Sequence, residues 1–302
     1  MRQTDIRDVY RTVRSRVVGR ERELTSILAA LGAGRDLLLE GPPGTSKSTI
    51  LREITAHYGI PFFLVEGNAD LTPAKLLGYH NPAQVVRHGY RPEDFVFGPL
   101  PRAMREGGFL YIEEFNRVPE DTLNALLTAM AEREVTISRV GKIEALPTFR
   151  IVGAMNPFDN VGTARISVSI YDRLCRLAMG YQSEGEEREV VRLRTASGSE
   201  RLIGKVVAIT RATRDHPDVR LGSSVRGAID LVLIAGQLAE IRDVSLNGSA
   251  EGVDAVLLEA ASLALSSKVS LHEGLERSPE DVIRELVRSF APAAVEGERE
   301  ET

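Results

Sequence analysis

Residues 41–49 combine a glycine-rich turn with a lysine and hydroxyl side chains, a set that suits phosphate chemistry. An apolar run, 37–39, precedes the turn, and a helical pattern begins at Lys47. A strand, a tight loop and a helix N-terminus in this order form a phosphate-binding loop, whose backbone amides surround phosphate oxygens. In such a loop Lys47 reaches the β- and γ-phosphates of ATP, and the Ser48 hydroxyl binds Mg²⁺. The predicted nucleotide-binding residues here are Gly41, Pro42, Pro43, Gly44, Thr45, Ser46, Lys47, Ser48 and Thr49.

One position of this loop departs from the usual pattern. Ser46 stands where G-x-x-x-x-G-K-[ST] has its second glycine. Because this residue joins the loop to the helix, we expect a small side chain with right-handed helical dihedral angles there. The alternative is a glycine-rich turn without a ligand, which leaves the pair Lys47-Ser48 at the helix start without a role.

Two carboxylates and an amide follow two other predicted buried strands. Glu113 and Glu114 come after 109–112, and Asn156 comes after 149–154. In this arrangement the first carboxylate holds Mg²⁺, usually through water, and the second orients and deprotonates the attacking water. Glu113 stands where aspartate is usual, so the carboxylate on the metal side is longer by one methylene group. The alternatives, two exposed carboxylates at a strand end and a simple turn asparagine, stay open.

Short apolar strands alternate with amphipathic helices over the first part of the chain, a pattern typical of an α/β fold with a parallel sheet. The five strands are expected at 36–40, 62–65, 109–112, 149–154 and 175–179. In an open α/β sheet, ligands bind beyond the carboxyl ends of the strands. We therefore expect Lys47, Glu114 and Asn156 to converge on one site.

The chain after this region changes character. From Glu184 to about Phe290 the pattern is almost entirely helical, with Gly222-Ser223-Ser224 preceding a long helix over 225–242. We expect an α/β nucleotide-binding core over 1–182, an all-helical lid over 183–290 and a disordered acidic tail over 291–302. Within the core, the stretches 135–138 and 142–145 predict a hairpin.

Composition narrows the class of protein. The chain has 302 residues, 43% of them hydrophobic and 27% charged, which is typical of a globular protein with a large core. The net charge of −5 argues against a broad nucleic-acid-binding surface. No apolar run reaches the roughly 18 residues of a membrane span, and the N-terminus lacks the features of a secretion signal. We therefore expect a cytoplasmic protein. The single cysteine, Cys175, is expected in the core.

The motifs, taken together and in this order, resemble the MoxR family of AAA+ ATPases. The resemblance covers about residues 15–245. Its segments are GPPGTSKST (41–49), GNADLTPAKLLGY (67–79), FVFGPLPRAM (95–104), LYIEEFNRVPEDTLNALLTAMAEREVTI (110–137), IVGAMNP (151–157), VGTARISVSIYDRL (161–174) and LGSSVRGAIDL (221–231). The phosphate loop is also similar to that of the CoxD-type branch, maturation factors for molybdenum-containing carbon monoxide dehydrogenase. The resemblance implies an AAA+ P-loop core with a five-stranded parallel sheet flanked by helices, followed by an all-helical lid.

The resemblance also implies roles for residues outside the phosphate loop. Arg173 matches the arginine finger, which reaches the γ-phosphate bound by a neighbouring subunit, and Arg176 is a second candidate for that role. Arg226 matches the second-sensor arginine of the lid, and Val18 lies in the segment near the adenine base. The hairpin at 135–145 and the insertion at 67–98 are similar to family elements that can face a ring pore.

These roles together predict a Mg²⁺-dependent ATPase that forms a ring, expected to be a hexamer. The resemblance implies a chaperone that remodels or matures a client, often a metalloenzyme, through a partner with a von Willebrand A domain. One alternative is a nucleic-acid motor or loader on the same core, which the net charge disfavours. The other is a small-molecule kinase, which would need neither Arg173 nor a lid carrying Arg226.

Overall fold

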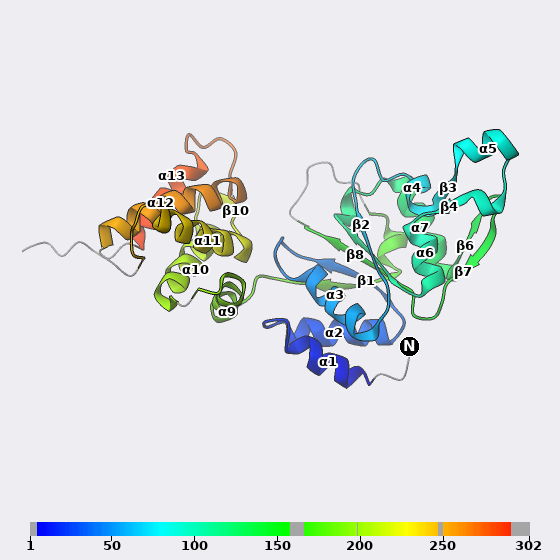
Figure 1. Cartoon of the computed structure of the whole chain (residues 1–302), viewed down its shortest axis with the longest axis horizontal. Helices are drawn as coiled ribbons and strands as arrows, with labels where there is room; N and C mark the ends of the chain where they lie inside the picture. The colour runs from blue at the N-terminus through cyan, green and yellow to red at the C-terminus, as the bar shows by residue number, and fades with distance from the viewer. Residues whose placement is uncertain (1–4, 158–165, 198, 247–249, 291–302) are drawn as a thin grey trace, which may run out of the picture. The chain divides into compact units, whose positions relative to one another are not determined.

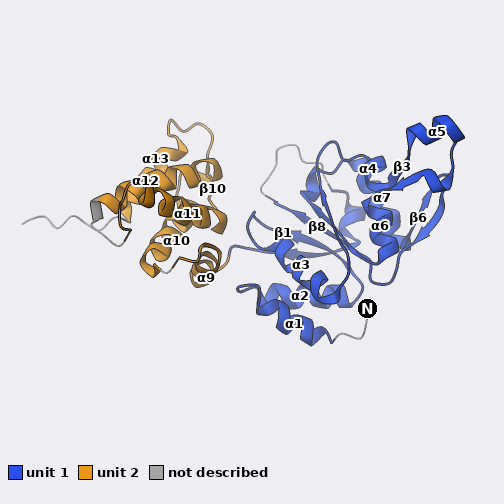
Figure 2. Ribbon diagram, viewed as in Figure 1, with its two compact units in different colours: residues 1–181 blue, residues 182–302 orange. Residues whose placement is uncertain are grey.

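The computed structural model describes residues 5–157, 166–197, 199–246 and 250–290. The chain divides into two compact units, residues 1–181 and residues 182–302 (Figure 2). Each unit is described by itself. The predicted acidic tail over 291–302 lies outside the described residues.

The first unit is built on a five-stranded parallel sheet (Figure 1). Its strands are β1 (Asp36–Glu40), β2 (Phe62–Glu66), β5 (Phe109–Glu113), β8 (Arg150–Met155) and β9 (Leu174–Ala178). They lie side by side in the order β2-β5-β8-β1-β9, and every neighbouring pair is parallel. The five expected strands are confirmed, each to within one or two residues at its ends.

Apolar side chains cover both faces of this sheet, because successive residues of a strand point to opposite sides. Leu38 packs into one hydrophobic core, whereas Leu37 and Leu39 pack into another. A strand that is buried on both faces reads as a continuous apolar run, as 37–39 does in the sequence. Burying each such leucine contributes about 1.5–3 kcal/mol, so the run favours an interior position for β1, between β8 and β9.

Helices flank the sheet on both sides, and the unit also contains two separate two-stranded sheets. Strand β3 (Gly78–His80) pairs with β4 (Phe95–Phe97), and β6 (Glu134–Ile137) pairs with β7 (Gly141–Glu144). The hairpin expected near Gly141 is thus confirmed. The helices of this unit are α1 (Ile6–Arg14), α2 (Glu21–Gly32), α3 (Lys47–Tyr58), α4 (Pro73–Leu77), α5 (Pro82–His88), α6 (Pro99–Glu106), α7 (Glu120–Glu132) and α8 (Val168–Tyr171).

The second unit is mainly helical, with helices α9 (Glu184–Thr195), α10 (Glu200–Asp215), α11 (Val225–Ile241), α12 (Ala250–Leu265) and α13 (Pro279–Ser289). Ser183 and Ser278 begin two of these helices with capping boxes, which satisfy amide donors at the helix start. The prediction of an entirely helical segment is wrong in one detail. Strand β10 (Val219–Leu221) pairs antiparallel with β11 (Ser270–Leu271). These two stretches are only three and two residues long, too short for an apolar periodicity to be visible.

The expectation for Cys175 is also wrong, because this residue is exposed. It lies in β9, which has a neighbour on one side only. An edge strand receives less cover than a central one, and the order of strands cannot be read from a single apolar run.

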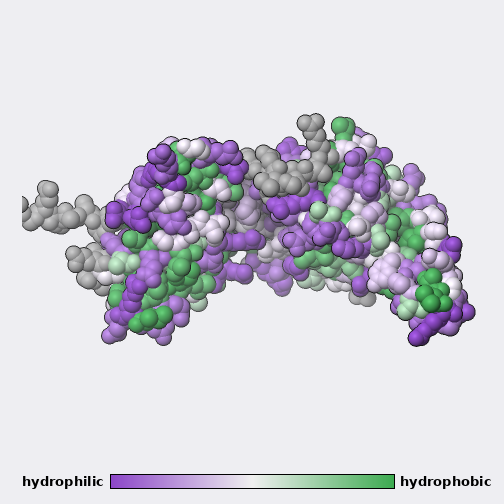
Figure 3. All heavy atoms as spheres, turned by 90° about the horizontal axis from the view of Figure 1, so that it is seen from above, coloured by the Kyte–Doolittle hydropathy of each residue, from purple (hydrophilic) through white to green (hydrophobic). Residues whose placement is uncertain are grey.

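Most of the surface in Figure 3 is hydrophilic or mixed, with local hydrophobic groups. Four large apolar side chains in and around β3, α5 and β4 are exposed, namely Tyr79, Val86, Tyr90 and Val96. Val86 is the most open of them, with 87% of its surface accessible. Helix α5 projects beyond the β3–β4 hairpin in Figure 1, so this segment presents apolar groups to solvent.

Candidate nucleotide-binding site

The carboxyl ends of three neighbouring strands lie at one edge of the sheet. Strands β5, β8 and β1 are adjacent and parallel. The loop 41–46 follows β1, Glu114 follows β5 and Asn156 follows β8. The structure therefore brings the phosphate loop, the carboxylate pair and the asparagine to the same edge, as the strand pattern led us to expect.

The start of the loop is closely packed and needs glycine. The Gly41 amide donates to the Met155 carbonyl over 3.0 Å, and the Met179 amide donates to the Glu40 carbonyl over 2.7 Å. A Cβ atom at Gly41 would lie 2.1 Å from the carbonyl oxygen of Met179. Farther along, Gly44 has a φ of +77°, which favours glycine as well. The glycines of the motif thus serve the fold of the loop.

Ser46 differs from the expectation. Its φ and ψ are 66° and 18°, in the left-handed region, so the predicted right-handed conformation is wrong. The loop must reverse direction just before α3, and a left-handed residue makes that turn where the usual motif has glycine. A non-glycine residue in this conformation costs about 1–2 kcal/mol.

Lys47 turns its ammonium group onto the loop. Its Nζ donates to the carbonyl oxygens of Gly41 over 2.8 Å and of Pro42 over 2.9 Å. Thr45 braces the same turn, because its buried hydroxyl donates to Pro42 over 2.9 Å. A cation held at the mouth of a ring of backbone amides is the arrangement that receives a polyphosphate.

The two acidic residues diverge because of the backbone between them. Glu113 ends β5, and Glu114 adopts left-handed dihedral angles of 50° and 44°. The Glu113 Oε1 atom accepts a hydrogen bond from the Tyr111 hydroxyl over 3.2 Å. The Glu114 Oε2 atom lies 3.3 Å from Arg117 Nε. The pair therefore has two different environments, as residues with different roles require.

Tyr111 and Arg117 are the residues of this edge that the sequence reasoning missed. Tyr111 lies two residues before Glu113 on the same face of β5, a spacing that could have indicated the contact. Burial raises the pKa of its phenol, and the nearby Glu113 carboxylate adds to that effect. Arg117 lies three residues after Glu114, and no simple pattern indicates its contact because the backbone turns at Glu114.

The candidate arginine fingers differ in their contacts. Arg173 is exposed, and its guanidinium donates to the Ser169 carbonyl over 2.7 Å. Arg176 instead pairs with the buried carboxylate of Glu40, with an Nε–Oε2 distance of 2.6 Å. This contact raises the pKa of Arg176. Because β9 lies beside β1, Arg176 pairs within its own chain, and its role as a second candidate finger stays a prediction.

Two other predicted residues, Val18 and Arg226, come from segments outside the sheet. Val18 is half-buried, in a turn that Arg20 ties down through a 2.8 Å hydrogen bond to the Gly180 carbonyl. Arg226 is exposed in the first turn of α11, where its amide donates to the capping hydroxyl of Ser224. Their contacts with a nucleotide remain predictions.

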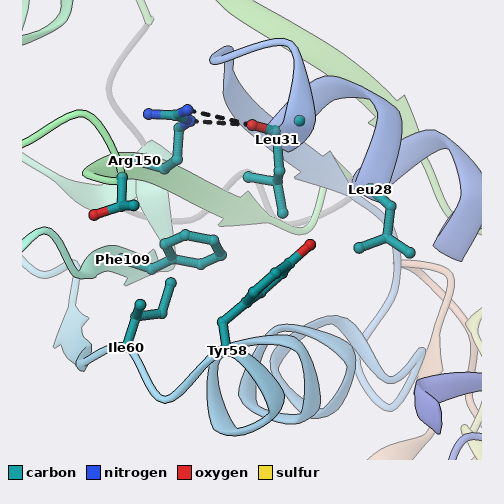
Figure 4. Close-up of a pocket in the computed structure, with 8 residues that line it drawn as sticks. Leu28, Leu31, Tyr58, Ile60, Phe109 and Arg150 are labelled. Carbon is teal, nitrogen blue, oxygen red and sulfur yellow. Dashed lines mark hydrogen bonds between the residues drawn. The ribbon is translucent and has the colours of Figure 1, made fainter. Parts of the chain in front are cut away.

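A small pocket lies at the other end of the parallel strands, where they begin (Figure 4). Phe109 and Arg150, the first residues of β5 and β8, line it together with Leu28, Leu31 and Tyr58. Figure 4 shows the Arg150 guanidinium donating twice to the Leu31 carbonyl, over 3.3 Å each. Its lining is mainly apolar, and the one guanidinium in it already donates to backbone carbonyls, so this pocket does not compete with the loop as the nucleotide site.

The comparison with known proteins agrees with a nucleotide-binding site. Residues 36–174 match the AAA domain family of the dynein-related subfamily. The protein YeaC of Bacillus subtilis is 32% identical over 251 residues, which cover 73% of this chain and 75% of YeaC. The chaperone MoxR1 of Mycobacterium tuberculosis is 29% identical over 177 residues, 58% of this chain and 44% of MoxR1. The chain belongs to the MoxR family of AAA+ ATPases.

A further relative and two solved structures are also similar to this MoxR-family chain. The gas vesicle ATPase GvpN of Ancylobacter aquaticus is 27% identical over 285 residues, 89% of this chain and 76% of GvpN. A Cytophaga hutchinsonii protein assigned as an ATPase has a TM-score of 0.51 at 21% identity, with 94% and 92% of the two chains covered. A RuvB variant of Thermotoga maritima has a TM-score of 0.57 at 15% identity, with 84% and 73% covered. The two solved structures confirm the predicted AAA+ fold and, at these identities, the fold alone.

Within the described part of the MoxR-family chain, no helix is both long and apolar enough to cross a bilayer. The same residues contain no cluster of three or more His, Cys, Asp or Glu side chains that could hold a metal.

Proposed function

We propose that this chain is a Mg²⁺-dependent ATPase that converts ATP and water to ADP and phosphate and uses the cycle to remodel a client protein. The observation that carries the proposal is the convergence of Lys47, Glu113, Glu114 and Asn156 at one edge of the sheet. MoxR1, named a chaperone, supports the remodelling role.

The phosphate loop receives the triphosphate in this proposal. Lys47 leaves the carbonyls of Gly41 and Pro42 and binds the β- and γ-phosphates, while the loop amides hold the remaining oxygens. The loop needs little rearrangement, because Thr45 and the Met179 backbone already fix its ends. Preorganised donors of this kind bind the charge that develops on the phosphates without a further cost in ordering.

The metal site fits Mg²⁺ by the chemistry of its donors. The Ser48 hydroxyl and the Glu113 carboxylate are hard oxygen ligands, which Mg²⁺ prefers. When bound, the metal would neutralise charge on the phosphates and so ease transfer of the γ-phosphoryl group.

In this proposal Glu114 and Asn156 activate and orient the attacking water. The Glu114 Oε2 atom is buried and accepts no hydrogen bond within the described residues, although Arg117 lies 3.3 Å away. A buried acceptor of this kind can take the proton of a water molecule. Asn156 directly follows β8, next to β5, and its amide would orient that water. The side chain of Glu114 would deprotonate it.

Assembly completes the site in the proposal. Arg173 would reach the γ-phosphate of a neighbouring subunit, and Arg226 on α11 would contact the nucleotide of its own chain. The exposure of both arginines supports these roles, since a buried or paired arginine would have to be released first. We infer that the assembly is a closed ring, because only a closed arrangement gives every subunit a neighbour that supplies the arginine. We further infer that the ring is a hexamer and that it is cytoplasmic, in line with the family resemblance.

A client or a partner needs a surface on the ring. The exposed side chains Tyr79, Val86, Tyr90 and Val96 supply an apolar one next to the β6–β7 hairpin. Arg139 at the tip of that hairpin lies 4.0 Å from the centre of the Tyr90 ring, which joins the two segments. We infer that the partner carries a von Willebrand A domain and that the client is a metalloenzyme. The CoxD-type branch remains a prediction.

Mixed assemblies test this proposal most directly. Arg173→Ala subunits and Glu114→Gln subunits should each be inactive in phosphate release, whereas a mixture should recover part of the activity. The recovery occurs because each partner supplies the group that the other lacks. No recovery, with both variants folded and oligomeric by mass photometry, would contradict a site shared between subunits. Stimulation of phosphate release by added DNA would instead favour a nucleic-acid motor.

A further inference from the structure

A tyrosine lies directly beneath the metal-side carboxylate. Tyr111 is 0% exposed, and its hydroxyl donates to Glu113 Oε1 over 3.2 Å. The two residues occupy alternate positions of β5, so both side chains project from the same face of the sheet. A buried phenol usually needs a hydrogen-bond partner, and here the partner is the carboxylate expected to serve the metal.

The ring of this tyrosine is held firmly. It stacks on Phe62 of the neighbouring strand β2, with centroids 5.5 Å apart and an angle of 30° between the planes. Arg52 of α3 lies over the other ring, 4.7 Å from the Phe62 centroid. The Ser48 side chain also lies near the Tyr111 hydroxyl, where it acts to lower the pKa of the phenol. The phenol is thus bonded to one of the groups that the proposed function assigns to Mg²⁺ and lies near the other.

The hydrogen bond from Tyr111 matters because the side chain of Glu113 is longer than that of the usual aspartate. A glutamate has one more rotatable bond than an aspartate, and fixing such a side chain costs up to about 2 kcal/mol of rotamer entropy. An anchored carboxylate has already lost this freedom before the metal arrives. Preorganisation of a ligand by a neighbouring hydrogen bond strengthens metal binding at many protein sites.

We propose that Tyr111 is a positioning residue that orients the Glu113 carboxylate toward Mg²⁺ beside Ser48. This inference rests on the proposed function, since it assumes that the metal binds with ATP at this edge. It goes further by explaining how a glutamate serves where an aspartate is usual. Tyr111 itself touches neither the nucleotide nor the metal.

The test measures metal binding rather than turnover. Mn²⁺ replaces Mg²⁺, and electron paramagnetic resonance follows its binding to the full chain loaded with a non-hydrolysable ATP analogue. Tyr111→Phe keeps the ring and removes the hydroxyl, and should weaken Mn²⁺ binding about tenfold, the size expected for one hydrogen bond to a charged group. The matched control is Tyr58→Phe, which removes a hydroxyl at the pocket of Figure 4 and should leave Mn²⁺ binding unchanged.

A second background separates positioning from packing. In a Glu113→Ala chain the hydroxyl has no carboxylate to orient, so adding Tyr111→Phe should have no further effect on Mn²⁺ affinity. An equal loss in both backgrounds would mean that Tyr111 only supports the fold, and would overturn the proposal. So would unchanged Mn²⁺ binding in Tyr111→Phe alone.

The failure of the proposed function would look different. If the unaltered chain binds Mn²⁺ no better with the ATP analogue than without it, the metal does not bind with nucleotide, and both proposals fall. If the analogue promotes Mn²⁺ binding and Tyr111→Phe does not change it, only the role of Tyr111 falls.

Discussion

The parallel strands begin at one end of the sheet, here called the amino edge, and finish at the other, here called the carboxyl edge. The two hold their charged groups in different ways. At the amino edge, Asp36 accepts from the Ile151 amide over 2.8 Å and pairs with Arg133 at 3.2 Å. At the carboxyl edge, Lys47 donates to backbone carbonyls, and Glu114 faces Arg117 at 3.3 Å with 38% of its side chain still exposed. Groups that satisfy each other stabilise a fold, whereas groups left with spare capacity can bind a ligand. The amino edge therefore stabilises the sheet, whereas the carboxyl edge is prepared for a ligand.

Removing the cation of the carboxyl edge should have the largest effect. Lys47→Ala should weaken binding of a fluorescent ATP analogue by about a hundredfold or more, because a charge-assisted contact with phosphate is lost. The unfolding midpoint in urea should stay within error of the unaltered chain. Lys75→Ala, an exposed lysine of α4, is the control. Tight binding retained in Lys47→Ala would mean that the nucleotide binds elsewhere.

Removing a cation of the amino edge should affect stability instead. Arg150→Met removes the guanidinium donors of the Pro147 and Leu31 carbonyls, of which Leu31 keeps the Gly34 amide as a donor, and should lower the free energy of unfolding by about 3 kcal/mol. Urea unfolding measures this loss, and nucleotide affinity should be unchanged. The half-exposed Arg102→Met serves as the control with a smaller effect. A loss of nucleotide affinity in Arg150→Met without loss of stability would contradict the division between the edges.

Gly41 and Gly180 differ in how closely other atoms pack against them, so they can be compared as a matched pair. Gly41→Ala should weaken binding of the analogue by about tenfold, since the new Cβ meets the Met179 carbonyl and such overpacking costs about 1–3 kcal/mol. Gly180→Ala should have no effect, because no heavy atom lies within 4 Å of its added Cβ. Isothermal titration of both variants decides the point, and equal affinities would show that the loop tolerates displacement.

Asp36 predicts a dependence of stability on pH. Burial raises its pKa above the ordinary 3.8, although Arg133 acts in the other direction. As pH rises through this window, the unfolded chain ionises Asp36 first, so the unaltered protein loses stability relative to Asp36→Asn. The slope cannot exceed about 1.4 kcal/mol per pH unit for one proton. Urea unfolding of both chains from pH 3 upward measures it, and a difference that grows in favour of the unaltered chain would show a lowered pKa.

The smallest effect is expected at Ser46. Ser46→Gly should raise the free energy of unfolding by up to about 1 kcal/mol, because glycine adopts the left-handed conformation without strain. Ser46→Ala keeps the Cβ atom and should show no gain. Thermal unfolding compares the two, and equal midpoints would indicate that the serine side chain compensates for its backbone.

The order of elements could be predicted from the sequence because it depends on local properties. Apolar runs such as 37–39 form buried strands wherever they lie in the core, and the loop 41–49 follows one of them. The phosphate loop, the carboxylate pair and Asn156 were placed on one edge for the same reason, since parallel strands share their carboxyl ends. The resemblance of motifs then added the roles of Arg173 and Arg226, which no local pattern indicates.

The remaining features depend on which segments become neighbours, and only the tertiary structure decided them. Arg176 pairs with Glu40, 136 residues away, because β9 packs beside β1. Cys175 is exposed because the same strand forms the edge of the sheet. Ser46 is left-handed because the loop must turn there, immediately before α3 begins at Lys47. Long-range packing sets the conformation and the partner of each residue, whereas the sequence by itself determined the strands, the loop and their order.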